Sequence, residues 1–202
     1  MHHILRSISY IFHPLLMPLL GVIFYFSKTP RYIPLPIIKA KLISIFILTI
    51  VLPVLLYYLL RTVRQVNSIH LQTTKERIIP LAMNAIIIVL VLLRILPQNE
   101  VIELYYFFLG ILLSTIACLI LAILKFKASI HMIAIGGVFM FFIALSIHFS
   151  INVNGTIALL FILIGAIATS RLYLKAHDYT ELTIGFFVGL VPQLLMLNYW
   201  LQ

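Results

Sequence analysis

The chain has little charge, and very little of that charge is negative. Asp and Glu together number 5 in 202 residues, against 14 Lys and Arg, and charged residues make up 9% of the sequence. Soluble domains carry about a quarter charged residues, so the composition excludes an ordinary soluble protein. The single cysteine, Cys118, excludes an internal disulfide and a cluster of thiolate ligands.

Long apolar runs take the place of the missing charge, and 63% of the residues are hydrophobic. A spanning helix needs ~20 apolar residues, and an open strand cannot satisfy its backbone hydrogen bonds in lipid. We therefore expect one all-α membrane domain over residues 1–202, a helix bundle with six or seven spans and no separate soluble domain. The apolar runs lie near residues 8–26, 42–60, 80–96, 104–124, 131–150, 156–174 and 181–200.

Proline breaks this pattern in two places. Pro14 and Pro18 interrupt the first run, which has no small-residue cleavage site after it and is expected to remain as a span. Segment 27–41 contains several prolines and is not expected to form one helix.

Alternation of the spans sorts the connecting loops onto two membrane faces. Loops 27–41, 97–103 and 151–155 and the C-terminus share one face. We call the other the motif face, and it carries the N-terminus and loops 61–79, 125–130 and 175–180.

Polar side chains collect on the motif face, above all in the stretch "SRLYLKAHDYTE" at residues 170–181. The short turn "INVNG" makes the fifth and sixth spans antiparallel neighbours, so the start of one lies beside the end of the other. We expect Gly136, Gly137 and Gly165 to let these two helices approach closely. The residues expected to meet at this face are Lys75, Arg77, Ser129, His131, Ser170, Arg171, His177 and Glu181.

This set of residues suits the chemistry of phosphate. Guanidinium and ammonium groups bind phosphate oxygens by charge-assisted hydrogen bonds. One imidazole can attack phosphorus while a second donates a proton to the leaving oxygen. Glu181 follows His177 by four residues, the spacing at which a carboxylate can orient the ring. The pattern predicts a phosphoryl-transfer site that needs no metal or cofactor.

Other interpretations of the same residues stay open. Lys75 and Arg77 could be interfacial anchors, and His131 and His177 could be interfacial histidines at the ends of spans. Ser129 could cap the fifth spanning helix. A metal site is a further alternative. It would consist of His131, His177, Asp178 and Glu181.

The motifs resemble those of the type 2 phosphatidic acid phosphatases, the membrane relatives of the vanadium haloperoxidases. "SRLYLKAH" with Glu181 is similar to the family's third signature, Ser-Arg-x5-His-x3-Asp. "ASIH", residues 128–131, is similar to Pro-Ser-Gly-His, and "KERIIP", residues 75–80, to a shortened Lys-x6-Arg-Pro. The resemblance covers roughly residues 60–195 and implies the helical core of that family.

The resemblance also implies a role for each matching residue. His177 would be the nucleophile that forms a phosphohistidine, and His131 would protonate the leaving alcohol. Glu181, where the family has Asp, would orient His177. Arg171, with Lys75 or Arg77, would hold the phosphate oxygens, and Ser129 would donate a hydrogen bond to one of them.

The sequence departs from the family at three further points. Ile130 and Ala128 replace the glycine and the proline of the second signature, and two spans separate the first two signatures. These departures keep a second hypothesis open, a relative that binds lipid phosphate without hydrolysing it. A third hypothesis, a small transporter or channel, is disfavoured because the spans contain few polar residues.

The expected substrate is a lipid phosphate, such as phosphatidate, phosphatidylglycerol phosphate or a polyprenyl diphosphate. We expect membrane lipids as partners and no nucleic acid. Nine Lys and Arg fall on the motif face and five on the other, which sum to the 14 of the sequence. Without Lys75, Arg77 and Arg171 the count is six to five, which does not fix the orientation. The resemblance favours a bacterial inner membrane with the site on the periplasmic side.

Overall fold

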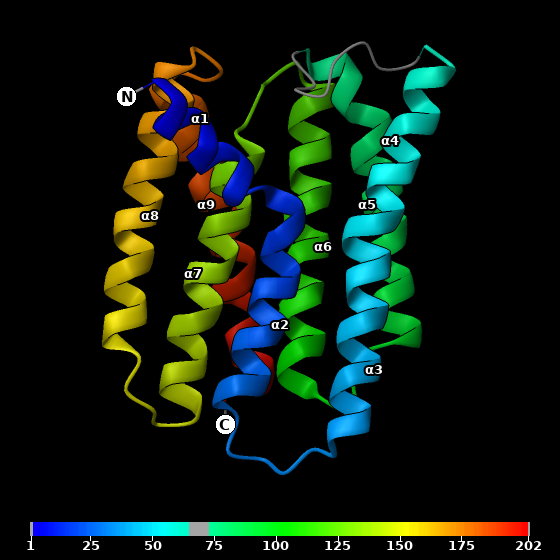
Figure 1. Ribbon diagram of the computed structural model, residues 1–202, viewed down its shortest axis with the longest axis vertical. Coiled ribbons are helices and arrows are strands. Elements are labelled where there is room, and N and C mark those ends of the chain that lie inside the picture. The colour runs from blue at the N-terminus through cyan, green and yellow to red at the C-terminus, as the bar shows by residue number, and fades with distance from the viewer. Residues whose placement is uncertain (1, 65–72, 202) are drawn as a thin grey trace.

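The computed structural model describes residues 2–64 and 73–201, and this part of the chain is helical with no strand (Figure 1). The expectation of an all-α bundle is therefore confirmed. Seven helical segments of the described chain are long and apolar enough to cross a membrane, which indicates an integral membrane protein. They are Ser7–Lys28, Leu35–Thr62, Thr74–Arg94, Ile102–Ile123, Ile130–His148, Asn154–Tyr173 and Tyr179–Trp200.

The first span is broken where the sequence predicts a break. Helix α1 (His2–Ile11) ends before Pro14, a 3-10 turn covers Pro14–Leu16, and α2 (Met17–Lys28) follows with Pro18 in its first turn. Proline is tolerated at these first positions because their N–H groups have no partner within the helix. The break lets α1 turn away from α2 and pack on α8 (Asn154–Tyr173) (Figure 1).

The next two spans begin earlier than expected. Helix α3 (Leu35–Phe46) starts inside the proline-rich segment, because Pro34 is its N-cap and Pro36 falls in its first turn. A π-helical turn, Ile47–Val51, joins α3 to α4 (Leu52–Thr62).

Helix α5 (Thr74–Arg94) also starts before the predicted residue 80. The Thr73 hydroxyl accepts a hydrogen bond from the Glu76 N–H and so caps the helix, which then continues through Pro80. The apolar run alone did not indicate this capped, polar first turn.

The last four spans are α6 (Ile102–Ile123), α7 (Ile130–His148), α8 and α9 (Tyr179–Trp200). Helix α7 is the most buried of the seven spans and packs most extensively on α9. The start of α1, the ends of α4, α6 and α8, and the starts of α5, α7 and α9 lie at one end of the bundle (Figure 1). The predicted division of the loops between two faces is therefore confirmed for the described residues, and residues 65–72 of loop 61–79 lie outside them.

The expectation that glycines bring α7 and α8 together is wrong. A Cβ at Gly136 would meet the Phe186 carbonyl, and one at Gly189 would meet the Ile133 carbonyl, so the close packing is between α7 and α9. Gly165 on α8 has no heavy atom within 4 Å of its Cβ position.

A second polar cluster lies at the end of the bundle opposite the motif face. The Glu103 carboxylate is fully buried and pairs with Arg31 at 2.8 Å and His148 at 3.2 Å. The Tyr25 hydroxyl donates to it at 3.2 Å, and the Trp200 and Phe149 rings pack on His148. No pattern in the sequence indicated this role for His148 and Glu103.

Candidate functional site

The centre of the site is the pair formed by His177 and Glu181 on the motif face. Asp178 caps α9 by accepting a hydrogen bond from the Glu181 N–H, which fixes the first turn of the helix. Glu181 reaches back from this turn, and its Oε2 lies 2.6 Å from Nδ1 of His177. The side chain of glutamate, one methylene longer than that of aspartate, therefore makes the contact for which the signature has Asp.

His177 is held as a neutral imidazole. His177 is 7% exposed to solvent. Burial, followed by the positive charges of Arg77, Arg171 and Lys127, lowers the pKa of His177 to about 3, while the Glu181 carboxylate acts in the opposite sense. In the neutral ring Nδ1 donates its proton to Glu181, so the lone pair is on Nε2.

Three cationic side chains from different elements surround this histidine. Arg77 in the first turn of α5 is 4% exposed, and its Nη1 donates to the Ala128 carbonyl at 2.7 Å. Arg171 at the end of α8 is 9% exposed, and its Nε is buried without a hydrogen-bond partner. Lys127, which the sequence did not single out, donates to the Ala176 carbonyl at 2.9 Å. Lys75 is exposed and lines neither the cavity nor the groove described below.

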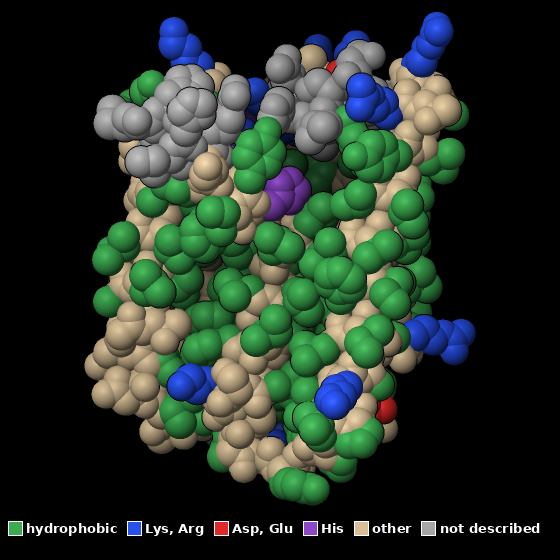
Figure 2. All heavy atoms as spheres, in the orientation of Figure 1, with side chains coloured by type: hydrophobic (Ala, Val, Ile, Leu, Met, Phe, Trp, Pro, Cys, Tyr) green, Lys and Arg blue, Asp and Glu red, His purple; other side chains and the backbone are tan. Residues whose placement is uncertain are grey.

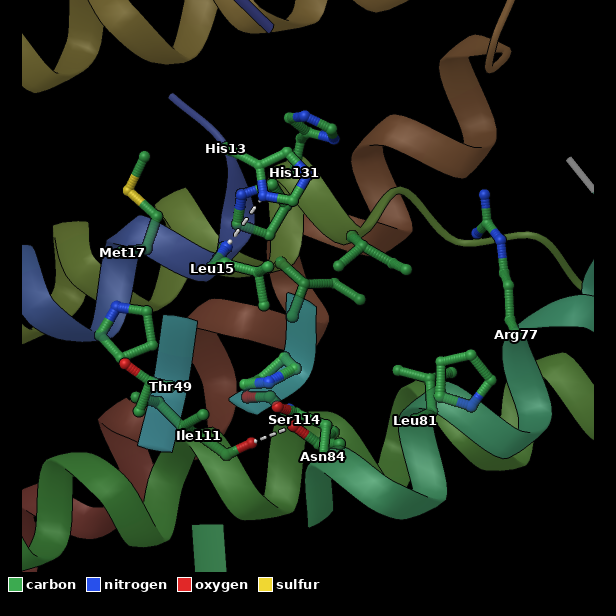
Figure 3. Close-up of a pocket in the computed structure, with 18 of the residues that line it drawn as sticks. His13, Leu15, Met17, Thr49, Arg77, Leu81, Asn84, Ile111, Ser114 and His131 are labelled. Atoms are coloured by element: carbon green, nitrogen blue, oxygen red, sulfur yellow. Dashed lines mark hydrogen bonds between the residues drawn. The ribbon is translucent and has the colours of Figure 1, made fainter. Parts of the chain in front are cut away.

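The N-terminal segment completes the site, which the sequence did not predict. The Ser9 carbonyl accepts a hydrogen bond from Nε2 of His131 at 3.2 Å, and the Ser9 hydroxyl lies 2.7 Å from that of Ser170. Nη1 of Arg171 lies 3.5 Å from the Ser9 hydroxyl. The ring of His13 stands edge-on to that of His131, with 5.7 Å between their centroids (Figure 3).

Backbone partners fix the tautomers of these two histidines. The Leu15 N–H donates to Nδ1 of His13, so this ring carries its proton on Nε2. A carbonyl can only accept, so Nε2 of His131 donates to Ser9, and Nδ1 is the nitrogen of His131 that can take up or release a proton.

Ser129 is at the N-cap position of α7, yet its side chain makes no capping hydrogen bond. The residue is fully buried, its Oγ has no hydrogen-bond partner, and its N–H donates to the Glu181 carbonyl at 3.1 Å. It does not line the cavity described below. Ser129 therefore ties the start of α7 to the start of α9, and its hydroxyl lies behind the cavity wall.

A cavity of about 1060 Å³ opens beside these groups and continues into the bundle. His13, His131 and Arg77 lie around its polar end, and Thr49, Ile111 and Ser114 lie across the cavity from His131 (Figure 3). Figure 2 views the bundle from the side and shows a hollow below the motif face, with a histidine side chain at its edge.

His177 also lines a shallow surface groove of about 390 Å³. Lys127, Lys175, Asp178 and Glu181 form other parts of this groove. His177 therefore lies between the groove and the deep cavity, so the ring can be reached from the membrane surface and from within the bundle.

The metal alternative gains no support from the arrangement. In the part of the chain that the structure describes, no three His, Cys, Asp or Glu side chains are grouped so that they could hold a metal ion. Asp178 is used as the cap of α9, and His131 bonds to the Ser9 carbonyl.

Comparison of the chain with protein-family models, with curated proteins and with solved structures gave no match.

Proposed function

We propose that the protein is a membrane lipid phosphatase that hydrolyses a phosphate monoester or diphosphate of a lipid through a phosphohistidine at His177. The observation that carries the proposal is the hydrogen bond between the neutral ring of His177 and the Glu181 carboxylate. Three buried or half-buried cations lie near this pair: Arg77, Lys127 and Arg171. Such a group favours a dianion beside a nucleophilic nitrogen.

The chemistry would proceed in two displacements. Nε2 of His177 attacks phosphorus, the bond from phosphorus to the lipid oxygen breaks, and that oxygen takes a proton from His131 in its imidazolium form. Water then attacks the phosphohistidine and gives a proton to His131, and the bond from phosphorus to nitrogen breaks to release inorganic phosphate. Arg77, Lys127 and Arg171 would bind the phosphoryl oxygens in both steps.

The tautomer of His131 adds a detail to this scheme. Nε2 keeps its proton on the Ser9 carbonyl, so Nδ1 of the neutral ring carries none. Nδ1 would take up a proton from solvent when the phosphate dianion binds beside it, and would then pass that proton to the leaving oxygen. Ser9 would position the ring by fixing this assignment, much as Glu181 positions His177.

The protein would use this site on lipids because the site lies where a headgroup meets the hydrocarbon core. Arg77 and Arg171 are both within the last or first turn of a spanning helix, at the depth of lipid phosphates. By resemblance we place the protein in a bacterial inner membrane with the motif face toward the periplasm. No metal or cofactor takes part in the proposed reaction.

A second candidate is a lipid-phosphate-binding protein that does not hydrolyse its ligand. Two observations favour it: the Ser129 hydroxyl is behind the cavity wall, and Ile130 lines the cavity where the signature has a glycine. Both reduce the number of donors that can reach a phosphate from the start of α7.

Phosphate release from purified protein tests the proposal. Wild type, His177→Gln and Lys75→Gln would each be given phosphatidate, phosphatidylglycerol phosphate and a polyprenyl diphosphate in detergent with EDTA. We expect release by wild type and Lys75→Gln and none by His177→Gln. Release by His177→Gln, or release that EDTA abolishes, would overturn the mechanism. Binding without release by wild type would favour the second candidate.

A further inference from the structure

The cavity below the cations has walls unlike those of a polar-solute site. Thr49, Ser114 and Thr115 line it, and each hydroxyl donates to a carbonyl in the preceding turn of its own helix. Gln193 lines it too, and its Nε2 donates to the Phe107 carbonyl at 2.8 Å. Asn84 and Tyr57 also line the cavity, and the Tyr57 hydroxyl is buried without a hydrogen-bond partner. Most of the remaining surface that a bound molecule would meet is apolar.

The cavity reaches about halfway through the membrane. Along α5 its lining runs from Arg77 to Ile88, which is ~16 Å at 1.5 Å per residue. The hydrocarbon core of a bilayer is ~30 Å thick. The deepest lining residues on α6, α7 and α9 are Phe107, Val138 and Gln193, each 3% exposed or less, so they close the floor.

One wall of the cavity also faces the outside of the bundle. Val54 and Tyr58 on α4 line the cavity and are 39% and 55% exposed, and Tyr10 on α1 lines it and is 56% exposed. Toward the motif face α1 turns to one side of the bundle and α4 lies on the other side (Figure 1). Through this wall a lipid would enter sideways from the bilayer without leaving hydrocarbon.

We propose that this cavity binds a hydrocarbon chain of an anionic lipid, with the headgroup at the cations and the chain end near Gln193. The inference rests on the proposed function for its headgroup end and deepens it by placing the substrate's chain inside the bundle. The site then selects lipids by chain length, because a short chain leaves the lower part of the apolar cavity unfilled.

Photo-crosslinking tests the chain position without requiring catalysis. The probe is a long-chain alkyl phosphate with a diazirine at the end of the chain, applied to wild type and His177→Gln in lipid nanodiscs. We expect labelled residues at the floor, near Ile111, Val138 and Gln193. Labels confined to outward-facing residues such as Ile120, which is 52% exposed, would overturn the inference.

A matched pair of substitutions on α6 tests the selectivity. Ile111 lines the cavity and Ile120 faces outward on the same helix. We expect Ile111→Trp to lower kcat/KM for dipalmitoyl phosphatidate about tenfold or more and to change that for dioctanoyl phosphatidate about twofold or less. Ile120→Trp should change neither. Equal losses on both substrates, or no loss, would contradict the length selection.

The two experiments separate this inference from the proposed function. If no lipid phosphate is hydrolysed but the floor is labelled, the chain site stands and the phosphatase does not. If phosphate is released but only outer residues are labelled, the phosphatase stands and the chain site does not.

Discussion

In the described part of the chain, two histidine–glutamate pairs lie one at each end of the bundle, and they differ in what surrounds them. Glu181 is partly exposed and lies 2.6 Å from His177 beside Arg77, Lys127 and Arg171. Glu103 is fully buried, and it accepts from Arg31, Tyr25 and His148 at once. Three cations therefore lie near the His177–Glu181 pair. At the other end, the negative charge of Glu103 is paired with the positive charge of Arg31.

Space separates the two pairs as clearly as charge does. His177 lines both the deep cavity and the surface groove, whereas the rings of Phe149 and Trp200 pack on His148. The same two residue types therefore have different roles at the two ends of the bundle. Three cations beside an open cavity favour binding of an anion, and a carboxylate paired among packed rings stabilises the fold.

The largest contrast should come from the histidines themselves. His177→Gln should lower phosphate release about a thousandfold or more, because it removes the nucleophile. His148→Gln should leave kcat/KM per folded molecule within about threefold, since His148 is remote from the site. Steady-state release with the folded fraction measured by size-exclusion chromatography checks both. Similar losses in the two variants would contradict the assignment.

The second largest difference in activity should be between substitutions of the two arginines near these pairs, Arg171 and Arg31. Arg171→Ala should lower kcat/KM by roughly a hundredfold to a thousandfold through the loss of charge stabilisation at the phosphoryl group. Arg31, whose side chain is 47% exposed, pairs with Glu103 at the other end. Arg31→Ala should spare activity and lower the melting temperature. A full loss of activity in Arg31→Ala would break the division between the two ends.

Removing each carboxylate should produce opposite kinds of defect. Glu103→Gln should destabilise the protein by about 2–3 kcal/mol, because the amide lacks the negative charge and keeps only one of the two acceptor oxygens that three buried or half-buried partners share. Glu181→Gln should instead lower kcat about a hundredfold and change the melting temperature little, as the ring of His177 loses its orientation. Thermal unfolding in detergent and release kinetics on both variants would show whether the effects separate in this way.

The smallest effect concerns pH and stability. The folded-state pKa of His177, about 3, is below the ordinary value of about 6.5. Above pH 6.5 the ring is neutral in both states and has no effect. As pH falls from 6.5 toward 3, the unfolded chain takes up a proton that the folded chain does not, so stability is lost.

At pH 5 this loss is at most about 2 kcal/mol. The difference in melting temperature between wild type and His177→Gln, measured at pH 7 and pH 5, isolates it. Wild type should lose more stability on acidification than the variant does. A wild type that gains stability relative to the variant at pH 5 would mean that Glu181 holds the ring protonated.

Much of the fold could be predicted from the sequence because its signals are local. Apolar runs place the spans, their alternation divides the loops between two faces, and the four-residue spacing within one turn brings Glu181 to His177. The starts of α3 and α5 were misplaced because caps and first-turn prolines, and not hydropathy, determine them.

The rest of the site depends on tertiary packing that no local pattern encodes. Residues 75 and 77 are ~200° apart on a helix of 3.6 residues per turn, so at most one faces the cavity, and the sequence could not show which. Ser9 and His13 reach the site because the break at Pro14 redirects α1. The glycine contacts between α7 and α9 depend on which neighbours pack, which the order of the spans leaves open.

If His177 becomes covalently phosphorylated in each turnover, the phosphorylated protein can be trapped and its label located. Wild type and His177→Gln would be mixed with a lipid phosphate that carries a radiolabelled phosphoryl group and quenched in base within one turnover. We expect an acid-labile, base-stable label on the peptide that contains His177 in wild type and no label in His177→Gln. Rapid release of labelled phosphate with no label on the protein at any time would contradict it.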